Sequence, residues 1–441
     1  MKKLLAMLLA AAMTIGTASV AFADDGDLFA IGNKTYPTLG AAVEAASGME
    51  GTVTIRMLDN ASGGGVKVED GASIVFDFGG YTYTVGAPTV GSTGTETNGF
   101  QLLRGSNVTM CNGTVMAGNY EKLKILIQNY SDLTLENVTL DARKDPQCQY
   151  VASNNFGSLN VIGNTNIYAQ DGEKAFDVYY WPDNGYGDGV TVTINTTGEI
   201  VGDVEYGSDG TESGKANVAK KAVLKVENGK IDGAISTAKL GSEGANVDVT
   251  GGIFTSDTTW TDYTKNAEVK AELQKDGVTE AYWYGPASKT IDASDYDGVV
   301  VTKAASNAVK VAGSDVEVTN GMDTPLSVNG TSIKGGEVII VTREPAERDT
   351  TGGDYFGNEK WAKVKREIAA AEEGDTIEMS ATGLPWFPSS VARALKGRDI
   401  TLEVRKNGVT YSINGLEIGA IEKIWYEFDQ IDTELLTVEA E

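Results

Sequence analysis

The chain has 441 residues, no histidine, and 62 Asp and Glu against 36 Lys and Arg, which gives a formal net charge of −26. Without histidine, Ser-His-Asp and Cys-His catalysis and zinc sites with His ligands are excluded. The negative charge disfavours nucleic acids and anionic membranes as partners, and it suits a soluble protein and divalent cations.

Residues 1–23, MKKLLAMLLAAAMTIGTASVAFA, have two early lysines, an apolar stretch and a final small-x-small sequence, AFA. This pattern predicts a secretory signal peptide removed before Asp24, and therefore an exported protein, secreted or at the cell surface. An uncleaved membrane anchor is the alternative, but the apolar stretch is short and broken by Thr and Ser. Loss of the two lysines changes the net charge to −28. We expect no integral membrane segment after signal cleavage.

The segment 36–58 predicts a short helix followed by a strand. Its apolar residues Leu39, Ala42, Val43 and Ala46 have helical spacing, and the strand sequence TVTIRML follows a glycine break. A helix here would cap the open end of a stacked structure and cover its core.

A repeat occupies the next part of the chain. Each copy has two apolar residues at i and i+2, a corner of Asn or Gly, and a further apolar residue. The copies are FDFGGYTY from Phe76, VTMCNGTV from Val108, LTLENVTL from Leu133, LNVIGNTNI from Leu159, VTINTTGEI from Val192, LKVENGKI from Leu224 and VDVTGGI from Val247, at spacings of 32, 25, 26, 33, 32 and 23 residues. Such periods indicate a stacked architecture, and Asn and Gly tolerate the positive φ of sharp corners.

We interpret each copy as one coil of a right-handed parallel β-helix, a solenoid, in a mainly β protein. A single coil cannot bury its own apolar residues, so the coils must stack into a continuous core. The predicted β-helix spans 24–285. Its longest insertions lie between Asp171 and Gly189 and between Val204 and Ala219.

Two further modules are predicted after the repeat. Short apolar segments indicate a small β-rich module at 286–345. The region 346–441 reads as a C-terminal α+β module, with an amphipathic helix and strand over 359–379, a helix start at Pro388 and Ser389, and a hairpin at Asn407-Gly408. The apolar positions of the amphipathic helix are Trp361, Val364, Ile368 and Ala371.

Three segments carry a resemblance to a known group of proteins. They are NKTYPTLGAAVEAASGMEGTVTIRML from Asn33, GGIFTSDTTWTDYTKNAEVKAELQKDGV from Gly251 and LPWFPSSVARALKGRDITLEVRKNGVTYSING from Leu384. Together they resemble exported, adhesin-like β-helix proteins of Gram-positive gut bacteria with a pectin-lyase-like coil. The first two are similar to the family's opening helix and closing stretch. The third resembles a C-terminal module of surface proteins in such bacteria. The resemblance implies fold and location, and it carries no catalytic signature.

A charged cluster follows one coil strand in the sequence LDARKDPQ. Asp141, Arg143, Lys144 and Asp145 combine carboxylates with a nearby base, which suits calcium-assisted proton abstraction from an acidic sugar. The alternative is a solvated loop whose charges keep the solenoid edge from pairing with other chains.

A second candidate site is AFDVYYWPDNGYGDG at 175–189. Here the aromatic residues Tyr179, Tyr180, Trp181 and Tyr186 alternate with the acids Asp177, Asp183 and Asp188. Exposed aromatic faces beside carboxylates are typical of a sugar-binding platform. The alternative is that alternate residues fill the coil, since Val178 and Tyr180 have strand alternation.

Two further features concern metals and cysteines. Asp183 and Asp188 are weak candidates for Ca²⁺ because the loop lacks the closing Glu of an EF-hand, and no other cofactor is predicted. Cys111 and Cys148 lie near consecutive coils. In an exported protein they form either one disulfide or two unpaired thiols.

Two functions are compatible with the sequence. The favoured one is a non-catalytic, adhesin-like protein that binds a glycan or another surface ligand, including a surface protein, through solenoid loops. The alternative is a polysaccharide lyase or glycoside hydrolase that acts on an acidic polysaccharide, with Asp141, Arg143 and Asp145 as catalytic residues. One scaffold hosts many activities, so the fold does not separate the two.

Overall fold

The computed structural model describes residues 26–436, apart from 183–184, 239, 241, 243, 256–258, 314, 342–357, 382–383, 385, 407–408, 422 and 424. The predicted signal peptide therefore lies outside the described residues. The chain is mainly β, as predicted, and divides into two compact units, Met1–Arg343 and Glu344–Glu441. None of the helices in the described part combines the length and apolar character needed to cross a bilayer.

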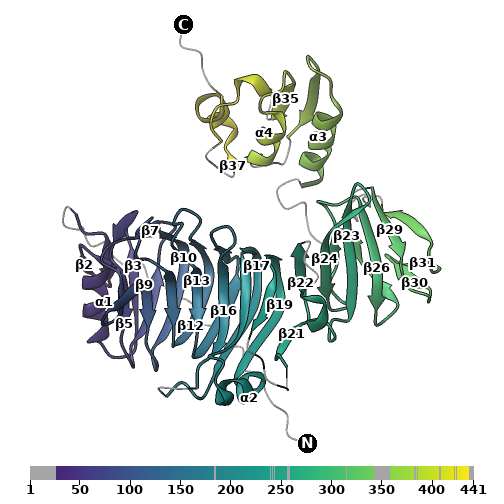
Figure 1. Ribbon diagram of the computed structural model, residues 1–441. Helices are drawn as coiled ribbons and strands as arrows, with labels where there is room; N and C mark the ends of the chain where they lie inside the picture. Colours follow the sequence, from purple (N-terminus) through teal and green to yellow (C-terminus); the bar gives the residue numbers. More distant parts are fainter. Residues whose placement is uncertain are drawn as a thin grey trace, which may run out of the picture. The chain divides into compact units, whose positions relative to one another are not determined.

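The first unit begins with a small cap around a helix. The helix α1 (Leu39–Ser47) buries Leu39, Ala42, Val43 and Ala46, which confirms the predicted apolar face. The Thr38 hydroxyl accepts a hydrogen bond from the Ala41 amide at 3.2 Å and so caps the helix. In Figure 1, α1 lies at the purple end of the stacked strands. The surrounding strands are β1 (Phe29–Ile31), β2 (Lys34–Tyr36) and β3 (Thr52–Met57).

The repeats form two sets of parallel strands separated by the predicted corners. In the longer strands, the two halves of one strand belong to the two sets. Besides β3, which pairs parallel with β6, the members are β4 (Ala61–Gly63), β6 (Ser73–Asp77), β7 (Thr82–Val85), β10 (Asn107–Ala117), β12 (Asp132–Asp141), β14 (Gly157–Gly163), β15 (Asn166–Tyr168), β17 (Val190–Val201), β19 (Ala222–Asp232), β21 (Val247–Val249) and β22 (Gly252–Thr255).

A third set of parallel strands, here called the third sheet, receives one strand from each coil. It contains β5 (Val66–Val68), β9 (Thr95–Leu102), β11 (Ile125–Asn129), β13 (Tyr150–Asn154), β16 (Lys174–Tyr180), β18 (Asp203–Ser208) and β20 (Ile235–Ala238). The short strand β8 (Val90–Ser92) pairs antiparallel with β9. Large, mostly parallel sheets of this kind are compatible with a β-solenoid, in which each coil stacks on the next.

The corners have the backbone conformation that the sequence predicts. Asn112, Asn137 and Gly163 occupy equivalent corners with φ of 57°, 53° and 64°. Non-glycine residues rarely adopt this left-handed region, and Asn does so more readily than most. The apolar residues before the corners are fully buried, and each contributes roughly 1.5–3 kcal/mol to folding. They include Val108, Leu133, Leu159, Val192 and Leu224.

The small β-rich region continues the first unit. The strand β22 pairs antiparallel with β24 (Val278–Gly285), and β23 (Val269–Lys275) pairs with both β24 and β26 (Gly298–Ala304). This region's core therefore starts at Val269, before residue 286. Its other elements are β25 (Ile291–Asp292), β27 (Ala308–Val309), β28 (Val311–Ala312), β29 (Val316–Asn320), β30 (Leu326–Val328), β31 (Thr331–Ile333) and β32 (Val338–Val341). A helix, α2 (Glu212–Lys221), lies in the insertion after β18.

The second unit is an α+β fold. Its elements are α3 (Asn358–Ala370), β33 (Thr376–Ser380), β34 (Phe387–Pro388), α4 (Ser389–Leu395), β35 (Thr401–Lys406), β36 (Val409–Asn414) and β37 (Trp425–Tyr426). Strands β35 and β36 form the predicted hairpin, although its turn residues Asn407 and Gly408 lie outside the described residues. The predicted helix buries Trp361, Val364 and Ile368.

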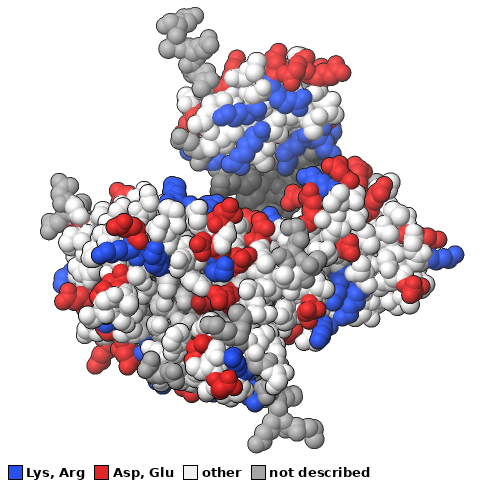
Figure 2. Space-filling view, viewed as in Figure 1, with Lys and Arg blue, Asp and Glu red and all other residues white. Residues whose placement is uncertain are grey.

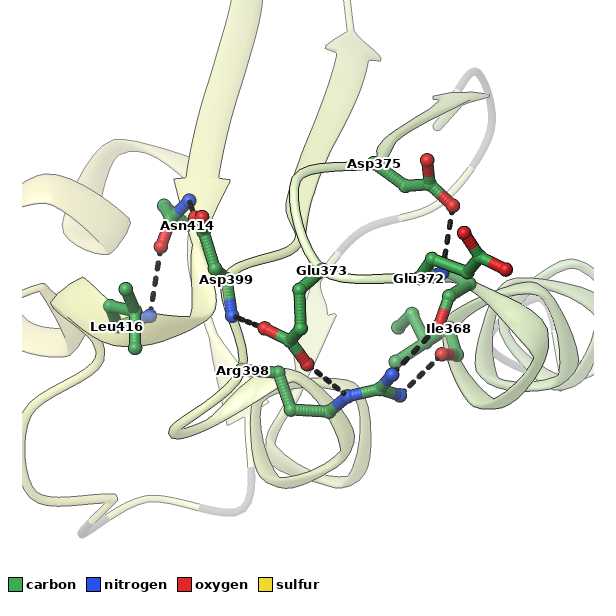
Figure 3. A network of polar contacts seen from close by, with 9 residues as sticks. Ile368, Glu372, Glu373, Asp375, Arg398, Asp399, Asn414 and Leu416 are labelled. Carbon is green, nitrogen blue, oxygen red and sulfur yellow. Dashed lines mark hydrogen bonds and ion pairs between the residues drawn. The ribbon is translucent and has the colours of Figure 1, made fainter.

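Arg398 ties the end of α3 to this unit's sheet (Figure 3). Its guanidinium donates to the carbonyls of Ile368 at 2.6 Å and Ala371 at 2.8 Å, and it pairs with Glu373 at 3.4 Å. The same Glu373 carboxylate accepts a hydrogen bond from the Asp399 amide. A cation at a helix C-terminus satisfies orphan carbonyls and favours the helix dipole, so we assign this network a structural role.

Candidate functional site

A row of polar side chains crosses the third sheet from coil to coil. Strand register places Gln101, Gln128 and Ser153 beside one another, and Asp177 beside Glu205. A hydrogen bond from the Ser153 hydroxyl to Asp177 Oδ2, at 2.8 Å, joins the two groups. We call these five residues the polar row.

The polar row faces outward because of strand alternation. The residue before each member belongs to the buried core, and successive side chains of a strand point to opposite faces. These core residues are Phe100, Ile127, Ala152, Phe176 and Val204. The row therefore runs along the outer face of the third sheet.

Most members of the polar row are hydrogen-bonded to neighbouring coils. Gln128 Nε2 donates to Asn155 Oδ1 at 2.7 Å, and the Tyr150 hydroxyl donates to Glu205 Oε2 at 2.6 Å. Gln101 is the exception. Its Oε1 atom is buried without a hydrogen-bond partner, and the side chain is 6% exposed. A buried acceptor without a donor is unfavourable by about 1–3 kcal/mol.

Asp177 is the buried acid of this row, with 5% of its surface exposed. Burial raises the pKa of its carboxyl group to about 8, although hydrogen bonds from the Asn154 amide and the Ser153 hydroxyl oppose the shift, and Glu205 adds to it. Asp177 is therefore mostly a neutral carboxylic acid at pH 7. Burial and the hydrogen bond to Glu205 also raise the pKa of Tyr150.

An aromatic cluster lies beside the polar row. Tyr186 stacks on Tyr130 with ring centroids 4.7 Å apart, and Phe156 lies 5.6 Å from Tyr186. Arg104 holds the loop that carries Tyr186. Its Nη1 donates to the Gly185 carbonyl at 2.8 Å, and its guanidinium carbon lies 5.0 Å from the centre of the Phe156 ring. We call Tyr130, Phe156 and Tyr186 the aromatic cluster.

The four predicted aromatic residues separate into two groups. Tyr179 and Trp181 lie 6.2 Å apart at the end of β16, and Trp181 is 40% exposed. Tyr186 is partly exposed in the aromatic cluster. Tyr180, in contrast, is 4% exposed and packs in the core with Val178, so it does not belong to a surface platform. Strand alternation points it inward.

The predicted calcium ligands form no site in the described residues. Asp183 lies outside them. Asp188 is exposed, and one of its carboxylate oxygens lies 3.8 Å from Arg104. Among the described residues, no group of three or more His, Cys, Asp or Glu is placed to hold a metal ion.

The charged cluster at 141–145 stabilises a loop. Both carboxylate oxygens of Asp141 accept hydrogen bonds from the Arg143 guanidinium, at 3.0 and 2.7 Å. Burial raises the pKa of Asp141, but the bonds from Arg143 outweigh this effect and lower it. Asp145 is fully buried and accepts the backbone amides of Tyr120 and Gln147. Lys144 is exposed. Both carboxylates thus accept hydrogen bonds from groups of the protein.

The two cysteines are free and buried. The sequence left open whether Cys111 and Cys148 form a disulfide or remain two unpaired thiols, and the structure has the unpaired thiols. Cys111 lies at a corner next to Asn112, whose side chain is 3.5 Å from its sulfur, whereas Cys148 packs into the core.

Sequence reasoning missed Gln101, Gln128, Ser153, Tyr150 and Glu205. The signal is present but short. The triplets FQL, IQN, ASN, FDV and VEY each place a polar residue directly after an inward residue of the third sheet. The repeated sequence pattern covers only the corner and the strands around it, and the third strand of each coil lies outside that pattern.

No protein-family model, curated protein or solved structure matches this chain. The candidate site therefore rests on the geometry of the third sheet.

Proposed function

We propose that the chain is an exported, adhesin-like protein, secreted or at the cell surface, whose right-handed parallel β-helix binds a glycan without catalysis. The observation that carries this proposal is the polar row of the third sheet, with an aromatic residue exposed beside it. Amide, hydroxyl and carboxyl groups exchange hydrogen bonds with sugar hydroxyls. Aromatic rings pack against the apolar faces of sugar rings. Binding sites for small ligands commonly combine such apolar contacts with a few precisely placed polar groups.

Trp181 is the best placed exposed contact. Trp and Tyr are enriched at interfaces because they combine an apolar body with a polar group, and Trp181 lies directly after β16 next to Tyr179. The aromatic cluster is already packed by Arg104 before any ligand binds, so little side-chain freedom is lost on binding.

A glycoside hydrolase is a second candidate, favoured by one observation. Asp177 and Glu205 are direct neighbours on adjacent strands, and the pKa of Asp177 is raised to about 8. Paired carboxyl groups, of which one holds its proton, are the usual requirement for cleavage of a glycosidic bond. We place this candidate second because Asp177 is nearly covered and its two oxygens already accept hydrogen bonds from Ser153 and Asn154.

The experiment is a retention and turnover assay on the purified mature chain. Wild type, Trp181→Ala and Trp386→Ala are passed over a panel of immobilised polysaccharides, with and without Ca²⁺, and new reducing or unsaturated ends are measured. Trp386 is the matched control because it is also a partly exposed tryptophan, but in the second unit. We expect retention that Trp181→Ala weakens and Trp386→Ala does not. Product formation that Asp177→Asn abolishes would replace binding with the hydrolase.

A further inference from the structure

The polar row offers a repeating ligand one contact per coil. It crosses five successive strands of the third sheet, β9, β11, β13, β16 and β18. Neighbouring strands in a sheet are roughly 4.8 Å apart, and a sugar ring in a linear polysaccharide advances by a similar length. In a glycan that crosses the strands, each successive sugar ring can therefore lie opposite the next residue of the polar row.

Gln101 marks the end of this row with an unused acceptor. Its Oε1 atom is buried and has no donor, while the Nε2 atom of its neighbour Gln128 donates to Ser153 and Asn155. A ligand hydroxyl that donates to Gln101 would satisfy it once the Gln101 side chain rotates to bring Oε1 to the surface. This unpaired atom indicates a missing hydrogen-bond donor, independently of the aromatic residues.

The charge of the third sheet selects against acidic ligands. Its strands contain two basic residues, and each has an acidic partner, since Lys67 Nζ lies 3.0 Å from Glu69 and Lys174 Nζ lies 3.6 Å from Asp203. The row itself ends at Glu205, and Glu205 has no basic partner among its contacts in the described residues. A uronic acid in this position would meet a like charge, which disfavours binding.

We infer that the ligand is an uncharged, linear glycan whose chain crosses the strands of the third sheet along the polar row, from Gln101 to Glu205. This inference rests on the proposed glycan binding and adds the class and direction of the ligand. It differs from the acidic polysaccharide expected for the enzyme alternative.

The test compares neutral polymers with carboxylated ones. Affinity of the mature chain is measured for hydroxyethyl cellulose against carboxymethyl cellulose and for neutral galactan against polygalacturonate, at low and at physiological salt. We expect one neutral polymer to bind at least about tenfold more tightly than its carboxylated partner, the equivalent of one good hydrogen bond or one avoided repulsion. For neutral oligosaccharides, affinity should rise with length up to five sugars and then level off.

Gln101→Leu tests the row itself, with Gln149→Leu as the control. Gln149 is an exposed glutamine outside the row. Gln101→Leu removes an unpaired buried acceptor, so it should leave the thermal midpoint unchanged or higher while it weakens neutral-glycan binding about tenfold. Gln149→Leu should change neither quantity.

The outcomes separate the two proposals. If no polymer binds, the proposed function is wrong. If carboxylated polymers bind as well as neutral ones, glycan binding stands and the inferred ligand class is wrong. If Trp181→Ala abolishes binding and Gln101→Leu does not affect it, the ligand does not follow the polar row. Glycan binding then stands, and the inferred direction of the ligand is wrong.

Discussion

Tyr186 stacks on Tyr130 with ring planes inclined by 21°, although one residue lies in a loop after β16 and the other follows β11. Arg104, from a third coil, fixes this contact by its bond to Gly185. Residues that follow or precede strands of three different coils thus meet beside the third sheet. Figure 2 shows acidic and basic side chains interspersed over the visible face of the first unit.

Arg104→Ala should release the loop that carries Tyr186. The change removes one hydrogen bond, one weak ion pair and a contact with Phe156, so global stability should fall by only about 1 kcal/mol. Limited proteolysis should become faster between residues 185 and 188, and glycan retention should fall. Arg405→Ala, which removes an exposed ion pair with Glu378 in the second unit, is the control. An unchanged cleavage rate would contradict the assigned role of Arg104.

Asp177 should make the protein less stable as the pH rises. Its pKa is about 8 in the folded state and about 3.8 in the unfolded chain. Between these values the unfolded chain releases the proton that the folded state keeps. The folded state is therefore favoured fully below about pH 4, and this contribution is lost progressively up to about pH 8. Asp177→Asn should remove this loss, so that the variant gains stability relative to wild type at pH 8.5 but not at pH 4.

Asp141→Asn is the matched opposite case, because the pKa of Asp141 is lowered in the folded state. Its contribution is present above the unfolded pKa and is lost as the pH falls through the folded pKa. This variant should be destabilised at pH 7 and differ little from wild type in strong acid. Denaturant unfolding at several pH values measures both variants, and parallel curves for the two would contradict the opposite shifts.

Asn137 should resist replacement by residues other than glycine. Its φ is 53°, and its side-chain oxygen accepts the Asn164 amide of the next coil at 2.8 Å. Asn137→Ala loses both features, at about 1–2 kcal/mol for the backbone and about 1 kcal/mol for the bond. Asn137→Gly loses only the bond and should be the milder change in thermal unfolding. Asn160→Ala, in the ordinary strand β14, is the control, and equal losses for both Asn137 variants would exclude backbone strain as the cause.

Cys111 and Cys148 should be unreactive in the folded protein. Burial raises the pKa of each thiol to about 12, and the nearby acids Asp77 and Glu136 for Cys111 and Asp145 for Cys148 add to the shift. A thiol reagent at pH 8 should label neither cysteine in the native state and both after denaturation without reductant. If denatured protein shows no free thiol, the two cysteines form a disulfide.

The sequence alone was sufficient for features set by local patterns. The corner residues Asn112 and Asn137, the inward residues Leu133 and Leu159, and the buried face of α1 all follow from spacing and from which residues accept a positive φ. Such features depend on a few neighbouring residues, so they can be recognised in the sequence whatever the length of the insertions between the repeats. They predict a mainly β chain with stacked coils and two helical regions near its ends.

Only the tertiary structure decided which side chains meet. Gln101 and Glu205 belong to one row because coils of unequal length align on their third strands, and no local pattern contains that register. Tyr180 points inward while Tyr179 points outward, since alternation is resolved only once the strand is paired. The carboxylate of Asp145 accepts a hydrogen bond from the amide of Tyr120, a residue on the preceding coil. Register across coils depends on contacts between residues far apart in the chain, and that is why the folded structure was needed to show that the polar residues of these short triplets lie in one row.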